Sequence, residues 1–150
     1  SGTLMKMSLL LVVMTTSTAF ALLAETKKPT SQDILVAATL ILEAGGESDP
    51  RAMRAVHEVI VNRSINRNLN QGQVVLQRLQ FSCWNDKDRR VELLNHAVGH
   101  PKFHDALKIA MNPPSNFTDG ATHYHAVYVN PYWAKSLKKT IQIENHIFYK

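Results

Sequence analysis

The sequence predicts a mostly helical α+β domain that ends in a small antiparallel sheet. Apolar residues recur at helical spacing over residues 34–44 and again over 52–63. Beyond residue 121 the pattern changes to short runs of strand-forming residues, at 122–129, 140–143 and 146–149. The 150 residues are enough for one such domain, expected over 34–150, with a short segment ahead of it.

Residues 1–24 are expected to be an export signal rather than part of the fold. Met5-Lys6-Met7 supplies a short basic start, an apolar run extends from Ser8 to Phe20, and Ala19-Phe20-Ala21 has the form of a cleavage site. The run is short for a transmembrane helix, although an uncleaved anchor or an N-terminal core helix is the alternative. Ser1–Leu4, ahead of the methionine, could be a cloning remnant. We therefore expect an exported protein of the periplasm, cell envelope or extracellular space, which contacts a membrane only through an uncleaved leader.

The first helix is predicted from Ile34 to Ala44, after a polar linker over residues 25–33. Ser31 or Asp33 is expected to be its N-cap, because short polar side chains accept hydrogen bonds from the first free N–H groups. Gly45-Gly46 is expected to end the helix, since glycine takes the left-handed capping conformation without steric cost.

The second helix is expected to begin at Pro50, which suits the first helical position, and to end near Asn62-Arg63. Further helices are predicted at 74–79, 90–98 and 102–111, joined by polar loops. In the sheet, Glu144-Asn145 is expected to form the turn between the last two strands.

The composition limits the classes of partner. The net formal charge is +5, which falls to +4 if Lys6 is lost with the leader, and a basic exported protein suits an anionic partner such as a bacterial envelope. Nucleic acid is the other usual partner of a basic protein, but lysines, arginines and aromatic residues are not interleaved along any one element, so no nucleic-acid binding is expected. Cys83 is the sole cysteine, which excludes an internal disulfide and a multi-cysteine zinc site. We expect a monomer.

The histidines do not predict a metal site. His96, His100 and His104 recur at every fourth residue, but Gly99 and Pro101 interrupt the helix that would align them. The sequence also lacks the H-E-x-x-H pattern of zinc proteases. We expect neither a metal nor another cofactor.

Glu43 is the candidate general acid. It follows an apolar helical stripe, so its side chain is expected to face the inner side of the helix, where desolvation raises the pKa of a carboxyl group. Gly45 and Gly46 leave room for a polymer to approach the backbone, and Glu47 is close enough to support a positioning network. The alternative is an ordinary solvated glutamate ahead of a glycine cap.

Six motifs, taken in order along the chain, favour the interpretation of Glu43 as a general acid over that of an ordinary solvated glutamate. The sequence resembles the cell-wall hydrolase family of spore-cortex-lytic enzymes over about Ile34 to Tyr149. The resemblance is carried by Glu43-Ala44-Gly45-Gly46-Glu47, Asn62-Arg63, Gln80-Phe81-Ser82, Asp119-Gly120-Ala121-Thr122-His123-Tyr124, Pro131-Tyr132-Trp133-Ala134 and Asn145-His146-Ile147-Phe148-Tyr149.

The resemblance implies a lysozyme-like catalytic domain that cleaves the glycan strands of peptidoglycan. Glu43, the first glutamate of the family's E-A-x-G-E motif, would be the catalytic acid. Many members carry arginine at the position of Gly45 and glycine at the position of Glu144. The second difference is expected to make the hairpin turn less favourable, because tight turns prefer glycine or asparagine.

The number of available carboxylates favours a single-acid mechanism. Most glycosidases place two carboxylates across the bond that they break. Glu43 and Glu47 are the obvious pair here, but both are expected on one side of the cleft. We therefore expect a lytic transglycosylase acting at the muramic acid–glucosamine β-1,4 bond. A hydrolytic muramidase and a non-catalytic peptidoglycan-binding protein of the same fold are the alternatives.

The remaining candidates support the acid or the substrate. Tyr124 is expected near Glu43 or the substrate, on the strand face opposite His123 and His125. Trp84 and Trp133 could stack on sugar rings or close the core. The candidate substrate-binding residues are Gln80, Phe81, Ser82, Trp84, His123 and Trp133.

Overall fold

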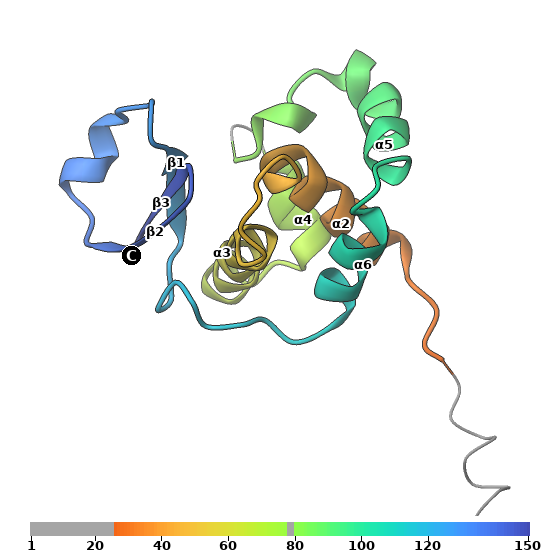
Figure 1. Ribbon diagram of the computed structural model, residues 1–150, viewed down its shortest axis with the longest axis horizontal. Helices are drawn as coiled ribbons and strands as arrows, with labels where there is room; N and C mark the ends of the chain where they lie inside the picture. Colours follow the sequence, from red (N-terminus) through yellow and green to blue (C-terminus); the bar gives the residue numbers. More distant parts are fainter. Residues whose placement is uncertain (1–25, 78–79) are drawn as a thin grey trace, which may run out of the picture.

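The computed structural model describes residues 26–77 and 80–150, and it confirms a mostly helical α+β fold with a small antiparallel sheet (Figure 1). The predicted export signal lies outside the described residues. Within them, no helix combines the length and apolar character needed to span a bilayer. The α-helices are α2 (Ser31–Ala44), α3 (Ala52–Arg67), α4 (Gln71–Leu76), α5 (Arg90–Val98) and α6 (Phe103–Met111). Three 3₁₀ turns are η1 (Ser82–Trp84), η2 (Lys87–Arg89) and η3 (Tyr132–Lys135), and the strands are β1 (His123–Ala126), β2 (Lys139–Ile143) and β3 (His146–Tyr149).

Helix α2 is the centre of the helical part. Helices α3, α4, α5 and α6 all pack against it (Figure 1). Every residue from Val36 to Ile41 is buried, as expected of a helix surrounded by other helices. Glu43 therefore lies on the last turn of the most enclosed helix.

Both ends of α2 differ from the predicted caps. Thr30, rather than Ser31 or Asp33, is the N-cap, and it forms a capping box in which its hydroxyl accepts from the Asp33 N–H at 3.1 Å. The helix accordingly begins at Ser31, three residues before the predicted start. Gly45 is right-handed, with φ −64°. A Cβ atom there would lie 2.5 Å from the Ile41 carbonyl oxygen, so close approach to the preceding turn, rather than left-handedness, favours glycine, and a larger residue would need the end of the helix to shift.

Helix α3 is longer than predicted. It continues to Arg67 and ends where Asn68 takes the left-handed conformation, with φ +52°. Helix α4 begins at Gln71, three residues before its predicted start, because Asn70 and Gln73 form a second capping box. Helix α5 has its predicted bounds.

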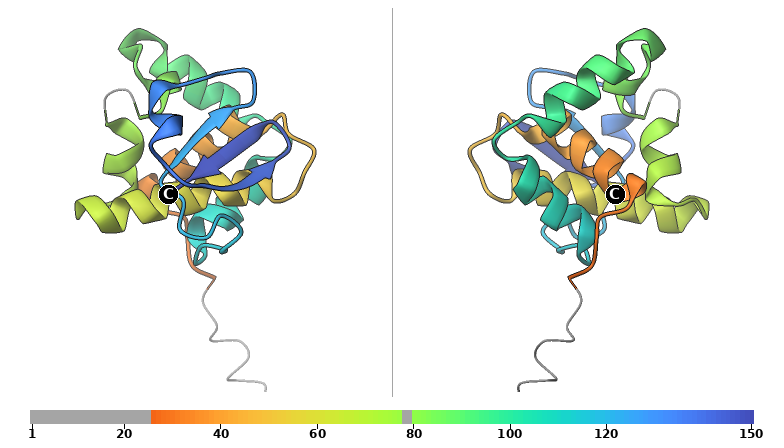
Figure 2. Two further views of the ribbon diagram at one scale, coloured as in Figure 1. Left: turned by 90° about the vertical axis from the view of Figure 1, so that its left-hand side faces the viewer. Right: turned by 90° about the vertical axis from the view of Figure 1, so that its right-hand side faces the viewer.

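The sheet has the strand order β1-β3-β2, and both pairings are antiparallel. Tyr124 pairs with Phe148, and the ring of Tyr124 stacks on Phe148 and meets the edge of His146. The predicted turn at Glu144-Asn145 joins β2 to β3. The sheet lies across α2 and α3, on the side opposite α5 and α6 (Figure 2).

Three side chains of α3 fix the segment that leads into the sheet. The Glu58 carboxylate, 2% exposed, accepts hydrogen bonds from the Ser115 hydroxyl, the Phe117 N–H and both the N–H and hydroxyl of Thr118, at 2.7–3.0 Å. Further along the helix, the Asn62 amide donates to the Ala121 carbonyl and the Arg63 Nε to the Thr122 carbonyl. These bonds set the position of Tyr124, two residues after Thr122.

Candidate active site

Glu43 lies partly buried where α2, η1, α3 and β1 meet. Burial raises the pKa of its carboxyl group above the ordinary value, because a charged carboxylate loses solvation there. Hydrogen bonding from Tyr124 and from Cys83, whose Sγ is 3.7 Å from Oε1, and the charge of Arg63 act in the opposite direction. The net result is an acid that holds its proton to higher pH than a solvated glutamate.

Arg63 places a buried positive charge beside this acid. Its Nε donates to the Thr122 carbonyl at 2.7 Å, and its guanidinium carbon lies 5.4 Å from the centre of the Phe81 ring. Its Nη1 is buried and has no hydrogen-bond partner among the described residues. Burial lowers the pKa of Arg63 to about 10, so the group stays charged at neutral pH, where it can stabilise a Glu43 carboxylate.

Glu47 belongs to a second group of contacts, between the α2–α3 loop and the β2–β3 turn. Its Oε2 accepts from the Asn145 amide at 2.9 Å, and its Oε1 lies 3.7 Å from Nδ1 of His146. Burial, followed by hydrogen bonding with Glu144, raises the pKa of Glu47. Glu47 thus connects the loop that follows Glu43 to the β2–β3 turn.

Glu144 completes this connection, which the sequence did not suggest. Its carboxylate accepts from the Ser48 N–H, the Ser48 hydroxyl and the Asp49 N–H. These bonds lower the pKa of Glu144 to about 2. Its backbone takes φ +50°, which costs energy for a residue other than glycine. The backbone of Glu144 is therefore unfavourable for the β2–β3 turn, as expected from the sequence. Its side chain offsets this energy by its hydrogen bonds to the α2–α3 loop.

A cavity of about 580 Å³ lies beside this loop, between α3 and α6. Ala44 and Glu47 line it, whereas Glu43 does not. No motif in the sequence pointed to this cavity, because its walls come from segments far apart in the chain.

A family model described as Cell Wall Hydrolase matches residues 46–149, most of the chain. The chain belongs to the cell wall hydrolase family. This membership supports an enzyme that acts on peptidoglycan, in the cell envelope or outside the cell. The match includes Arg63, Cys83 and Tyr124 but begins three residues after Glu43, so the case for Glu43 rests on the geometry and on its motif.

The hydrolase also shares its fold with a solved structure. The crystal structure of the catalytic domain of the Bacillus cereus SleB protein superposes with a TM-score of 0.52 at 21% sequence identity. The superposition covers 83% of this chain and 94% of that domain. No curated protein matches the chain.

Two of the six predicted substrate-binding residues of the hydrolase belong to its core. Phe81 is 1% exposed and Trp84 3% exposed, and the Trp84 indole N–H donates to the Thr39 hydroxyl at 2.9 Å. Neither ring is exposed enough to stack on a sugar, and for Trp84 the alternative, that it closes the core, is the one observed. Gln80 accepts from Arg67 at 2.9 Å, and Ser82 is exposed at the start of η1.

His123 and Trp133 lie together, but away from Glu43. Their ring centres are 5.1 Å apart, and His125 and Tyr149 join them in one aromatic cluster. The predicted alternation is confirmed, since this cluster occupies the sheet face opposite the Tyr124 and Phe148 rings. His123 and Trp133 are therefore not neighbours of the acid.

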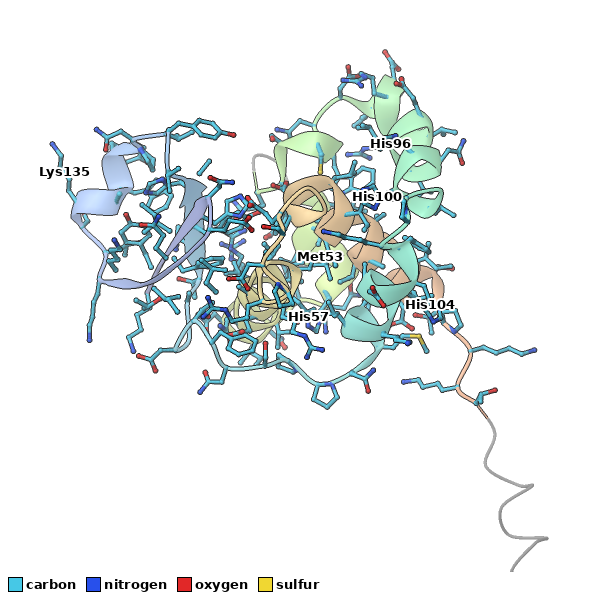
Figure 3. The ribbon with its side chains drawn as sticks, in the orientation of Figure 1. Met53, His57, His96, His100, His104 and Lys135 are labelled. Atoms are coloured by element: carbon cyan, nitrogen blue, oxygen red, sulfur yellow. The ribbon has the colours of Figure 1, made fainter. Side chains whose placement is uncertain are left out.

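The three regularly spaced histidines do not converge. His96, His100 and His104 are spread along α5, the following turn and α6 (Figure 3). Over residues 26–77 and 80–150, no group of three or more histidine, cysteine or acidic side chains is arranged to hold a metal ion.

Proposed function

We propose that this hydrolase cleaves the β-1,4 bond between muramic acid and glucosamine in peptidoglycan, as a lytic transglycosylase with Glu43 as its general acid. One observation carries the proposal. Glu43 has a raised pKa, and the side chains that act on it, Tyr124, Cys83 and Arg63, include no second carboxylate. Such a site suits a reaction in which one group first gives and then takes a proton.

The steps follow from this arrangement. Glu43 gives its proton to the glycosidic oxygen as the bond to the anomeric carbon of muramic acid breaks, and the ring acquires oxocarbenium character. Arg63 and the Tyr124 hydroxyl then stabilise the Glu43 carboxylate. The 6-hydroxyl of the same muramic acid attacks the anomeric carbon and returns its proton to Glu43. The products are a 1,6-anhydro end and a free glucosamine 4-hydroxyl.

Product masses test the mechanism. Purified peptidoglycan is digested with the wild-type enzyme, and the new muramic acid ends are measured by mass spectrometry. A transglycosylase leaves ends that are lighter by one water than those of a hydrolytic muramidase. Muramic acid ends with the mass of the hydrolysed sugar would contradict our mechanism and show a hydrolytic muramidase. Binding to sacculi without any cleavage would identify a non-catalytic peptidoglycan-binding protein.

We also propose that residues 1–24 direct export and are removed, which suits a substrate in the envelope. The intact mass of the protein recovered from the exported fraction tests this. A chain that retains the leader would contradict removal and would support a membrane anchor.

A further inference from the structure

The cavity beside the α2–α3 loop has the size of a ligand site. Its volume of about 580 Å³ falls in the range of roughly 300–1,000 Å³ that is typical of small-molecule sites. Met53 and His57, both on α3, line it and lie between α3 and α6 in Figure 3. Part of the wall is apolar, formed by Ala44, Pro50, Met53, Ile109 and Pro113.

Three cationic side chains line the cavity and keep their charge available. The Lys102 ammonium donates to the backbone carbonyl of Glu47 at 2.6 Å, a bond that leaves its charge uncompensated. Arg54 and Lys108 are exposed at the rim, and in the part of the chain that the structure describes neither forms an ion pair. All three can therefore bind carboxylates, and Arg54 can do so with two parallel hydrogen bonds.

Among the acidic side chains of the lining, Asp49 is paired with Arg51 at 2.8 Å. Glu47 accepts from the Asn145 amide, and its Oε1 lies 3.7 Å from Nδ1 of His146, which does not offset its charge at neutral pH because burial lowers the pKa of that imidazole. Asp105 has no ion-pair partner among the described residues. The three cations therefore outnumber the two acidic side chains that lack a cationic partner, and Asp105 suits an ammonium or amide N–H group.

The cavity adjoins the site of the proposed acid. Ala44, which follows Glu43, lines the cavity, and so does Glu47. A chain of contacts also leads from Glu47 to Glu43. Glu47 lies beside His146, and the ring centres of His146 and Tyr124 are 5.2 Å apart. Tyr124 in turn forms a hydrogen bond with Glu43. Glu43 and the cavity thus adjoin at the end of α2, which is the arrangement needed by a glycan at Glu43 that carries a side branch in the cavity.

We infer that this cavity binds a short acidic peptide, the carboxylate-bearing stem that branches from muramic acid. This inference rests on the proposed function, which places the glycan at Glu43. Apolar walls suit the methyl groups of alanine-type residues, and the cations suit the free carboxylates. The cavity would then select strands that still carry their peptides.

Direct binding tests the inference without turnover. A soluble tetrapeptide with free side-chain and terminal carboxylates is titrated into the full chain carrying Glu43→Gln, and heat or fluorescence reports Kd. We expect Arg54→Ala/Lys108→Ala to weaken binding at least tenfold. The same peptide with its carboxylates amidated should bind as weakly to the parent chain. Thermal unfolding of each variant checks that the fold is retained.

The matched control removes the same charge elsewhere. Lys135→Ala/Lys138→Ala takes two exposed lysines from the far side of the sheet, where Figure 3 shows Lys135 distant from α6. We expect a change in Kd of less than twofold. An equal loss of affinity in both double variants would show that only net charge matters, and it would overturn the inference. The absence of any binding at millimolar peptide would also overturn it.

Activity separates the two proposals. Wild-type enzyme should show a lower KM on peptide-bearing strands than on strands stripped of peptide, and Arg54→Ala/Lys108→Ala should abolish that difference. Peptide binding without any glycan cleavage would contradict the proposed function but support the peptide site. Glycan cleavage with equal KM on both kinds of strand, together with no peptide binding, would support the proposed function but contradict the peptide site.

Discussion

Opposing influences act on the pKa of Glu43. Burial favours the protonated form that a general acid needs, whereas Tyr124, Cys83 and Arg63 favour the carboxylate that remains after the proton has left. With burial alone, the proton would be held too tightly to be given away. With the three partners alone, the group would be ionised at neutral pH.

Cys83 offers a way to shift this balance. A serine hydroxyl is a stronger donor than a thiol, so Cys83→Ser should lower the pKa of Glu43, and Cys83→Ala should raise it. Because the proposed mechanism needs protonated Glu43, the alkaline limb of kcat/KM should move to lower pH in the serine variant and to higher pH in the alanine variant. Shifts in the same direction in both variants would show that Cys83 acts only through packing.

The burial of Glu43 should also cost stability at neutral pH. Its pKa in the folded chain is raised, so its contribution is favourable below the unfolded value of 4.5 and is lost as pH rises through the folded pKa. Glu43→Gln removes this penalty, and we expect the variant to have the larger free energy of unfolding at pH 7. Denaturant titrations should show the two proteins converging below about pH 4.5, and a variant less stable than wild type at pH 7 would contradict the account.

At the scale of single residues, the sequence predicted that Glu43 faces inward and that Tyr124 lies near it, but not which other side chains surround Glu43. An apolar stripe that ends in a carboxylate is visible within one helix, whereas Cys83 and Arg63 reach Glu43 from other elements. The residues next to Trp84 in the sequence are typical of a loop, whereas its burial in the core and its hydrogen bond to Thr39 depend on residues far away in the chain.

Among the elements, the β2–β3 turn and the α2–α3 loop depend on each other through Glu144. Glu144→Gln should lower the melting temperature at pH 7, since the amide accepts more weakly from Ser48 and Asp49. The folded pKa of about 2 lies below the unfolded value of 4.5, so this stabilisation is present above pH 4.5 and is lost as pH falls toward 2. Glu92→Gln, at an exposed ion pair with Arg89, is the control and should change little at either pH. A constant difference between wild type and Glu144→Gln from pH 7 to pH 2 would contradict the role of the charge.

Element bounds were predictable where local chemistry decides them. Helix α5 and strand β3 have their predicted bounds, because Gly99 follows the helix and the turn at Glu144-Asn145 precedes the strand. The start of α2 was missed because Thr30 and Asp33 cap it jointly, and the end of α3 because its last turn continues past Arg63 to a left-handed Asn68. Several short polar residues can serve as caps in such stretches, and packing selects among them.

At the scale of the whole molecule, Glu58 joins the helical part to the segment that carries the sheet. Glu58→Ala would leave the N–H groups of Phe117 and Thr118 without their acceptor, and a buried unsatisfied donor costs about 1–3 kcal/mol. We expect a loss of roughly 2–5 kcal/mol in the free energy of unfolding, together with reduced activity as β1 loses its position. Glu92→Ala is the control, and an equally small loss in both variants would show that the Glu58 contacts do not hold the sheet.

The fold class could be predicted from the sequence because periodicity changes once, from helical to alternating, near residue 121. The arrangement of the parts could not. The bonds of Glu58, the connection from Glu144 to Ser48 and the cavity between α3 and α6 all join residues far apart in the chain. Such contacts leave no periodic signature.

The most direct measurement is the release of soluble glycan from purified sacculi by wild type, Glu43→Gln and Glu92→Gln. A lost general acid typically costs 10²- to 10⁴-fold in rate, so Glu43→Gln should release glycan at least about a hundredfold more slowly while still binding sacculi. Glu92→Gln should match wild type. Release by Glu43→Gln at the wild-type rate would show that another group supplies the proton.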